Sequence, residues 1–188
     1  LRRVYPGCKI IVYNRGAKPR VMAMNDGTAN IAVDCVDDTF RECDYIFLCT
    51  PVEKNVEYLS LLKNIIKDDC IITDVGSVKS NIHAAIKKLN MEKNFIGGHP
   101  MAGSEKTGYE FSNDRLLENA YYPVTPTDSV DNKYVKEYSK IVSDIGAIPI
   151  EISYKEHDRV VAAVSHLPHL IASSLVNLVK HNDSPLEY

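Results

Sequence analysis

Short apolar runs alternate with segments of helical composition along most of this chain, and this alternation limits the folds open to it. Strands that alternate with helices of about 10 to 15 residues indicate βαβ units and a mostly parallel sheet. The pattern therefore predicts a doubly wound, Rossmann-like α/β domain over residues 1–152. The expected strands are 9–13, 44–50, 70–74, 95–98, 121–126 and 147–152, and the expected helices are 17–25, 52–66, 78–89 and 132–145.

The pattern changes near Glu156, where a long apolar segment begins. Its run VVAAVSHLPHLIASSLVNLV is rich in alanine, serine and leucine, which suits the packing of helix on helix. We expect residues 153–188 to be the start of a second, all-helical domain.

The charge balance argues against nucleic acid as a partner. The chain has 22 basic and 25 acidic residues with no run of like charges, so nothing attracts a polyanion or an anionic membrane. A small-molecule partner is the better expectation. We also expect no segment that approaches the roughly 18 apolar residues needed to cross a bilayer.

The five cysteines form no C-x-x-C pair, and their number is odd. Cys49 and Cys70 lie inside apolar strand-like runs, where cysteine behaves as a small hydrophobic residue. This usage indicates a reducing cytosol, so we expect a cytoplasmic protein.

A dinucleotide-binding sheet needs a glycine-rich turn after its first, central strand, and no G-x-G-x-x-G occurs in this chain. Residues 1–15 read as the end of a first helix that leads into a second strand. We therefore expect the first strand and its turn to lie upstream, in keeping with a chain that begins at Leu1. Without that strand, the sheet should have a gap in its middle.

The end of the strand 9–13 bears on the choice of cofactor. An acidic residue there would bind the ribose of NAD, whereas basic residues accommodate the 2′-phosphate of NADP. Asn14 and Arg15 follow this strand, with Lys18 and Arg20 close behind. The pattern favours NADP over NAD, and the alternative is a solvated basic turn.

Two further strand ends carry polar residues at the edge where open α/β sheets place their ligands. Thr50 and Pro51 follow one strand; the hydroxyl could reach a dinucleotide, while Pro51 could simply begin the next helix. Asp74 ends the next strand, and Ser77 stands where a helix N-cap is expected. Spacing alone favours capping for this serine over contact with a substrate.

The loop 97–111, GGHPMAGSEKTGYEF, is hard to explain as packing. It is dense in glycine and polar residues and directly follows a strand, and such loops often carry binding residues. Its His99 can accept a proton near neutral pH, which makes it a candidate general base.

Three histidines, His157, His166 and His169, fall within the segment HDRVVAAVSHLPH together with Ser165. Residues three apart share a helix face, so His166 and His169 could point together toward a cleft. A zinc pair is the alternative, but the segment lacks the H-E-x-x-H arrangement, and Pro168 would break or start the helix. Histidines buried at a domain interface are the third interpretation.

Together, four blocks resemble the prephenate and arogenate dehydrogenases of tyrosine biosynthesis. They are TDVGSVK (73–79), GGHPMAGSEKTGYEFS (97–112), PVTP (123–126) and HDRVVAAVSHLPHLIASSL (157–175), in the family's order. The resemblance implies a nucleotide-binding domain, a helical domain that makes a homodimer, and NAD(P)-dependent oxidative decarboxylation.

The resemblance also implies roles for single residues. His99 would take the proton of the ring hydroxyl of prephenate while hydride leaves the same carbon. Ser77 matches a serine that contacts the hydroxyl and this histidine, and His169 matches a histidine of the substrate pocket. The remaining matches line the pocket or lie beside it: Ser104, Glu105, Ser165 and His166. No metal site is implied.

The family's substrate-carboxylate arginine is expected beyond Tyr188, and Arg159 is not at that position, so we expect this chain alone to be poorly active. Three alternatives stay open: another hydroxy-acid dehydrogenase, a catalytically idle ligand-binding protein on the same fold, and a metal-dependent hydrolase. The sequence does not separate prephenate from arogenate.

Overall fold

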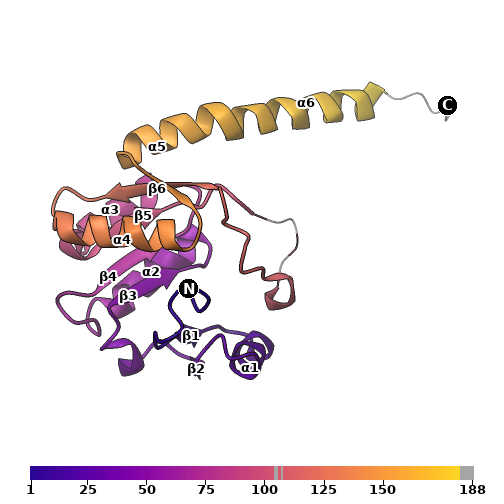
Figure 1. Ribbon diagram of the computed structural model, residues 1–188. Coiled ribbons are helices and arrows are strands. Elements are labelled where there is room, and N and C mark those ends of the chain that lie inside the picture. Colours follow the sequence, from indigo (N-terminus) through magenta and orange to yellow (C-terminus); the bar gives the residue numbers. More distant parts are fainter. Residues whose placement is uncertain (104–105, 107, 183–188) are drawn as a thin grey trace.

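The computed structural model describes residues 1–103, 106 and 108–182, and it contains an α/β body from which one long helix extends (Figure 1). The strands are β1 (Ile11–Tyr13), β2 (Ile31–Val33), β3 (Tyr45–Leu48), β4 (Ile71–Asp74), β5 (Ile96–Gly98), β6 (Tyr121–Pro126) and β7 (Ile148–Glu151). The α-helices are α1 (Ala17–Asn25), α2 (Val52–Leu62), α3 (Ser80–Lys88), α4 (Asn132–Asp144), α5 (Tyr154–Val161) and α6 (Leu167–Asn182). Short helical turns are η1 (Asp38–Phe40), η2 (Glu92–Asn94), η3 (Tyr109–Phe111) and the π-helix η4 (Ala162–His166).

The strands pair mainly in parallel. β1 pairs with β2 and β3 pairs with β4, and the parallel bridge between Ile72 and Phe95 aligns β5 with β4. β6 runs antiparallel to β5 and parallel to β7. In the part of the chain that the structure describes, no ladder joins β1 to β3. The sheet is therefore interrupted at the place where the sequence predicted a gap.

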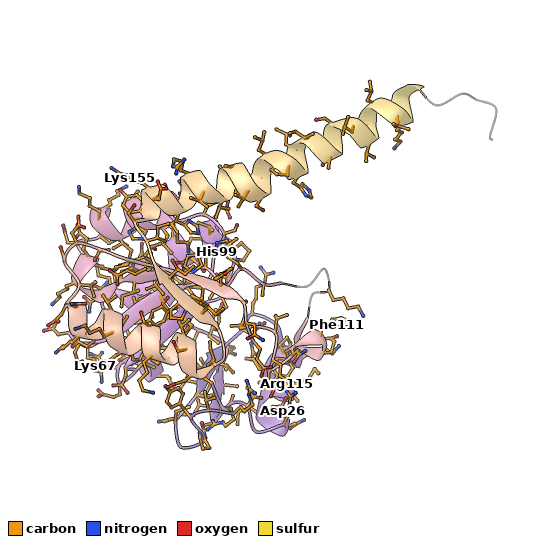
Figure 2. The ribbon with its side chains drawn as sticks, turned by 45° about the horizontal axis from the view of Figure 1, so that its top comes forward. Asp26, Lys67, His99, Phe111, Arg115 and Lys155 are labelled. Atoms are coloured by element: carbon orange, nitrogen blue, oxygen red, sulfur yellow. The ribbon has the colours of Figure 1, made fainter. Side chains whose placement is uncertain are left out.

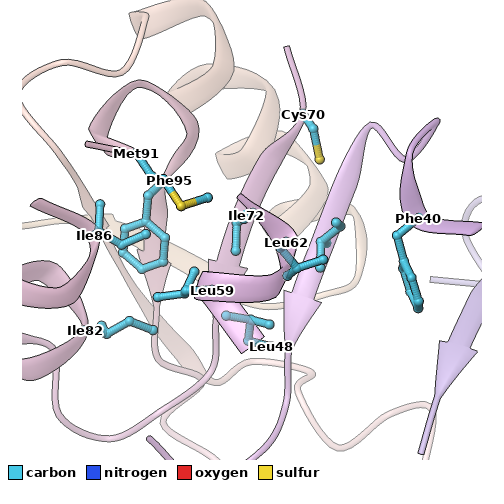
Figure 3. Packing of buried hydrophobic residues seen from close by; sticks show 11 residues of the cluster. Phe40, Leu48, Leu59, Leu62, Cys70, Ile72, Ile82, Ile86, Met91 and Phe95 are labelled. Carbon is cyan, nitrogen blue, oxygen red and sulfur yellow. The ribbon is translucent and has the colours of Figure 1, made fainter. Parts of the chain in front are cut away.

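Helices cover both faces of the β3–β4 region, so successive residues of β4 enter different cores. Ile72 packs with Leu59 of α2 and Ile82 of α3 (Figure 3). Its neighbour Ile71 packs on the opposite side with Tyr138 of α4. The two layers place the carboxyl ends of β3 and β4 at one edge of the body.

The first strands differ from the sequence pattern in two ways. The apolar run 9–13 is typical of a buried strand, but β1 is only half-buried because it lies in a two-stranded sheet with an open edge. β2 was not predicted, because its three residues give too short a run for a periodic signal.

One helix is longer and more apolar than we expected. The stretch Tyr154–Lys180, formed by α5, η4 and α6, has 27 residues, and its most apolar 18-residue window has a mean hydropathy of 1.3 and is 6% buried. By length and composition it could cross a membrane, so the expectation that no segment approaches this length is wrong. A helix in the core of a soluble protein meets the same criterion, so length and composition alone do not define a membrane span.

Pro168 does not end this helix, although it cannot form a regular helical hydrogen bond. The turns before it are wound as the π-helix η4, which changes the hydrogen-bond spacing where the proline ring would otherwise meet a carbonyl group. The chain therefore passes from α5 to α6 without a break.

Candidate functional site

The carboxyl ends of β4 and β5 are tied together by a buried ion pair. The Lys79 ammonium group donates to Asp74 at the end of β4 and to the carbonyl oxygen of Gly98 at the end of β5, the latter at 2.7 Å. Asp74 also accepts hydrogen bonds from the N–H groups of Gly76 and Gly98. Both charged side chains are fully buried. This arrangement fixes where the chain leaves β5 and enters the loop that carries His99.

Burial dominates the titration of this pair. It raises the pKa of Asp74 and lowers the pKa of Lys79, while their mutual attraction opposes both changes. Because the Asp74 carboxylate has no exposed surface, the structure does not support the expected direct contact with a cofactor. Asp74 instead holds the two strand ends.

The glycines before His99 are required by close packing. A Cβ atom at Gly97 would collide with the Thr125 hydroxyl, and one at Gly98 would lie 2.7 Å from the Tyr138 hydroxyl. Only glycine therefore fits at positions 97 and 98 of β5.

His99 lies on the side of the α/β body that faces the long helix (Figure 2). Its backbone N–H donates to Pro123 of β6, and its Nδ1 lies 2.9 Å from Nε2 of His157 in α5. Burial lowers the pKa of His99 to about 4, aided by its electrostatic interactions with His157, Lys79 and His166 and opposed by Asp158. The half-buried imidazole is therefore neutral at pH 7 and can accept a proton.

His157 and Asp158 join α5 to the α/β body. His157 is buried, and its Nδ1 lies 2.8 Å from Oδ1 of Asp158. The same carboxylate accepts the backbone N–H groups of Lys79 and Ser80, both at 2.8 Å, and the Ser80 hydroxyl. Asp158 therefore caps the N-terminus of α3 from another element of the fold.

The expectation that Ser77 is the N-cap was therefore wrong. α3 begins at Ser80, and the residue before it, Lys79, has no side-chain cap bond. The Asp158 carboxylate takes that role because it reaches the first free N–H groups of the helix. Ser77 is exposed, so its hydroxyl is open to solvent.

The fold brings only part of the segment 157–169, which carries three histidines, close to His99. Ser165, His166 and His169 are exposed on η4 and α6, and His166 is close enough to influence the pKa of His99. His157 instead is buried, and it contacts His99 of the α/β body. Among the described residues, no three His, Cys, Asp or Glu side chains are arranged to hold a metal ion. Ser104 and Glu105 lie outside the described residues.

The turn after β1 is basic and contains no carboxylate. The Asn14 side chain accepts the N–H of Gly16, and Arg20 donates to the carbonyl oxygens of Asn14 and Arg15. Lys18 pairs with Glu110 of η3 at 2.8 Å. Arg15 is exposed.

The turn after β3 has a polar rim. Thr50 is exposed, and its hydroxyl donates to Asn55 of α2 at 2.5 Å, which leaves its oxygen able to accept a further hydrogen bond. Pro51 stands immediately before α2 and acts as its N-cap residue without a side-chain bond.

Sequence reasoning missed Lys79 and Asp158, and it noted His157 without its contact to His99. Lys79 follows Ser77 in the same motif, and a lysine there could have been read as a partner for Asp74. The adjacent His157 and Asp158 carried a weaker signal, because nothing local indicates which strand end they contact.

Comparison with known proteins identifies the family. The sequence model of the prephenate dehydrogenase nucleotide-binding domain matches residues 1–151, and the model of the prephenate dehydrogenase dimerization domain matches residues 153–188. The chain belongs to the prephenate dehydrogenase family.

Individual relatives agree with this family. The chain is 33% identical to the prephenate dehydrogenase of Bacillus subtilis over 98% of its length and 50% of the relative. The crystal structure of Aquifex aeolicus prephenate dehydrogenase with hydroxyphenyl propionate and NAD+ superposes with a TM-score of 0.90 at 33% identity, covering 98% of this chain and 65% of that one. Synechocystis arogenate dehydrogenase gives a TM-score of 0.87 at 28% identity, covering 98% and 64%.

Family membership confirms the predicted Rossmann-like α/β fold. The chain spans about half the length of the curated prephenate dehydrogenases that it matches. Its exposed α6 falls within the segment that matches the dimerization domain.

A third histidine, His83 of α3, gives a prediction about acid stability. It is buried against Tyr154 of α5, with ring centroids 4.4 Å apart, and its Nε2 lies 3.1 Å from the Thr125 hydroxyl. Burial, aided by Lys79, lowers its pKa from 6.5 to about 4. Below pH 6.5 the unfolded chain binds this proton, whereas the folded chain binds it only near pH 4.

The stability that His83 gives the folded chain by staying neutral is therefore fully present above pH 6.5 and is lost as the pH falls toward 4. Between pH 7 and pH 4, the unfolding free energy of the parent should fall by about 3 kcal/mol more than that of His83→Gln, whose amide can still bond Thr125 but does not titrate. Urea unfolding of both proteins at several pH values measures this difference. Parallel pH dependences would contradict it.

Proposed function

We propose that the whole protein catalyses the NAD(P)-dependent oxidative decarboxylation of prephenate or arogenate. The observation that carries this proposal is the neutral His99 imidazole, held at the carboxyl edge of the sheet beside α5. The names of its relatives, prephenate dehydrogenase and arogenate dehydrogenase, support the same chemistry.

His99 acts as the general base in this proposal. It takes the proton of the substrate's ring hydroxyl at Nε2 as the C–H bond of the same carbon gives up its hydride. A bound nicotinamide supplies the hydride acceptor. Loss of carbon dioxide then leaves an aromatic ring, so the chain's own residues need only align the hydroxyl with the base.

The other site residues orient the substrate. The exposed Ser77 hydroxyl bonds the ring hydroxyl beside His99, and the exposed His169 lines the substrate pocket. The four residues that complete the pocket entrance and its border in this proposal are Ser104, Glu105, Ser165 and His166.

The cofactor is a nicotinamide dinucleotide, and we propose NADP rather than NAD. Residues after β1 fit the adenosine end of NADP because Arg15 is exposed and the residues between β1 and α1, Asn14–Gly16, include no carboxylate. Asn14 and Arg20 hold the turn that presents Arg15, and Lys18 adds positive charge. Thr50, with Pro51, borders the same edge of the sheet.

We propose that a second copy of the protein covers the long helix, which makes the protein a homodimer. Leu170, Ile171, Leu175 and Val179 are all more than half exposed on α6, and this segment matches the dimerization domain. The second domain accordingly begins at residue 153. We further propose that the dimer is cytoplasmic, in keeping with five free cysteines, and binds neither nucleic acid nor membrane.

A four-way assay tests the proposed activity. The whole protein is mixed with prephenate or arogenate and with NAD or NADP, and reduction of the cofactor is followed by absorbance. We expect turnover with at least one of the two substrates and faster turnover with NADP than with NAD. Arg15→Ala should reduce the preference for NADP because it removes an exposed positive charge from the turn after β1. Absence of reduction in all four mixtures would contradict the proposed function.

A further inference from the structure

A hydrogen-bonded chain runs from Asp158 through His157 to His99. His157 contributes both ring nitrogens: Nδ1 lies 2.8 Å from Asp158, and Nε2 lies 2.9 Å from Nδ1 of His99. The two histidine rings are steeply inclined, with an interplanar angle of 73° and centroids 5.1 Å apart. They therefore meet through their nitrogens rather than by stacking.

The direction of the hydrogen bond between His157 and Asp158 follows from the ionisation state of Asp158. Burial opposes ionisation of this carboxyl group, but bonds from the Ser80 hydroxyl, the Lys79 N–H and His157 outweigh burial and lower its pKa. An ionised carboxylate only accepts hydrogen bonds. Nδ1 of His157 must therefore be the donor.

The direction of the hydrogen bond between His157 and His99 follows from the number of protons on each ring. A neutral imidazole has one N–H, so once Nδ1 of His157 carries it, Nε2 is an acceptor. Nδ1 of His99 must then donate, and Nε2 of His99 is left with its lone pair.

We propose that His157 and Asp158 are positioning residues that hold His99 in the Nδ1–H tautomer, with its unprotonated Nε2 available to the substrate. This inference rests on the proposed function and adds the reason why His99 presents a base rather than an N–H group. When His99 takes a proton at Nε2, the new positive charge lies beside His157 and the Asp158 carboxylate. Within the described residues, His166 and Lys79 also act on the pKa of this ring.

Variants of His157 separate this role from packing. In His157→Gln, the side-chain amide reaches the position of Nε2 and can accept from His99. In His157→Asn, the shorter amide reaches the position of Nδ1 and can bond only Asp158. His157→Phe keeps the ring volume but bonds neither residue. The Gln and Asn variants are matched controls, because both place an amide in the same buried space.

The whole protein, with its histidines labelled with ¹⁵N, is studied by NMR at pH 8, where histidine is ordinarily neutral. We expect the Nδ1–H tautomer of His99 in the parent and in His157→Gln, and a change toward Nε2–H in the Asn and Phe variants. Turnover should fall about tenfold to a hundredfold in those two variants, the range seen when the partners that orient a metal-bound histidine are removed. It should be largely retained in His157→Gln.

The Nε2–H tautomer in the parent, or equal spectra and turnover for the Gln and Asn variants, would overturn the inference. The spectrum does not require activity, so it separates this inference from the proposed function. If the tautomer is as expected but removal of His99 leaves turnover intact, the positioning is correct and the assignment of the general base is wrong.

Discussion

Replacing His99 with asparagine is expected to lower the turnover of the whole protein about 10²-fold to 10⁴-fold, the usual contribution of a general base. The asparagine amide occupies the position of Nδ1 and can still donate to His157, so the packing between β5 and α5 is retained. What is lost is Nε2, the atom that takes the proton. Turnover should therefore fall far more than substrate affinity.

Steady-state kinetics of parent and variant measure this effect, with the unfolding free energy recorded for both proteins. His83→Gln is the matched control, because His83 is also buried near α5 but faces Thr125 and Tyr154 instead of His99. It should leave turnover unchanged. Near-normal turnover in His99→Asn would remove His99 from the proposed mechanism.

Replacing Lys79 with methionine is expected to lower the unfolding free energy by about 3 to 5 kcal/mol, the effect typical of removing one partner of a buried ion pair. Methionine fills a similar volume but leaves the Asp74 carboxylate buried without its counter-charge. The Gly98 carbonyl also loses its hydrogen-bond donor. The carboxyl ends of β4 and β5 then lose the link that fixes the loop of His99.

Urea unfolding at pH 7 measures the change. Lys54→Met is the matched control, because Lys54 pairs with Glu57 at 2.7 Å while both side chains are more than half exposed. That exposed pair should contribute at most about 1 kcal/mol. Adding Asp74→Asn to Lys79→Met should recover part of the loss, since it removes the buried charge and keeps an acceptor for one N–H group. Equal losses of unfolding free energy for Lys54→Met and Lys79→Met would show that the buried ion pair stabilises the protein no more than the exposed one.

The sequence predicted the elements whose signals are local. The bounds of α1 and β6 agree with those expected, and α4 ends one residue earlier than expected. The helix expected over 52–66 stops at Leu62, and the one expected from residue 78 begins at Ser80. Local periodicity defines the interior of a helix well, whereas its ends depend on capping partners that can come from anywhere in the fold.

The candidate base could also be found from sequence, because His99 stands in a polar, glycine-rich loop directly after a strand. The gap in the sheet was predictable for a similar reason: a dinucleotide-binding domain needs a first strand and turn that are not found in the residues before β1. These conclusions use only neighbours along the chain and the order of the elements.

Only the tertiary structure decided what surrounds that base. His157 lies 58 residues from His99, and Asp158 lies 78 residues from the Ser80 N–H that it caps. Asp74 changed from a candidate ligand-binding residue to a buried ion-pair partner for the same reason. Hydrogen bonds and burial depend on atoms brought together by folding, and residue spacing does not specify which distant donor will fill an open acceptor.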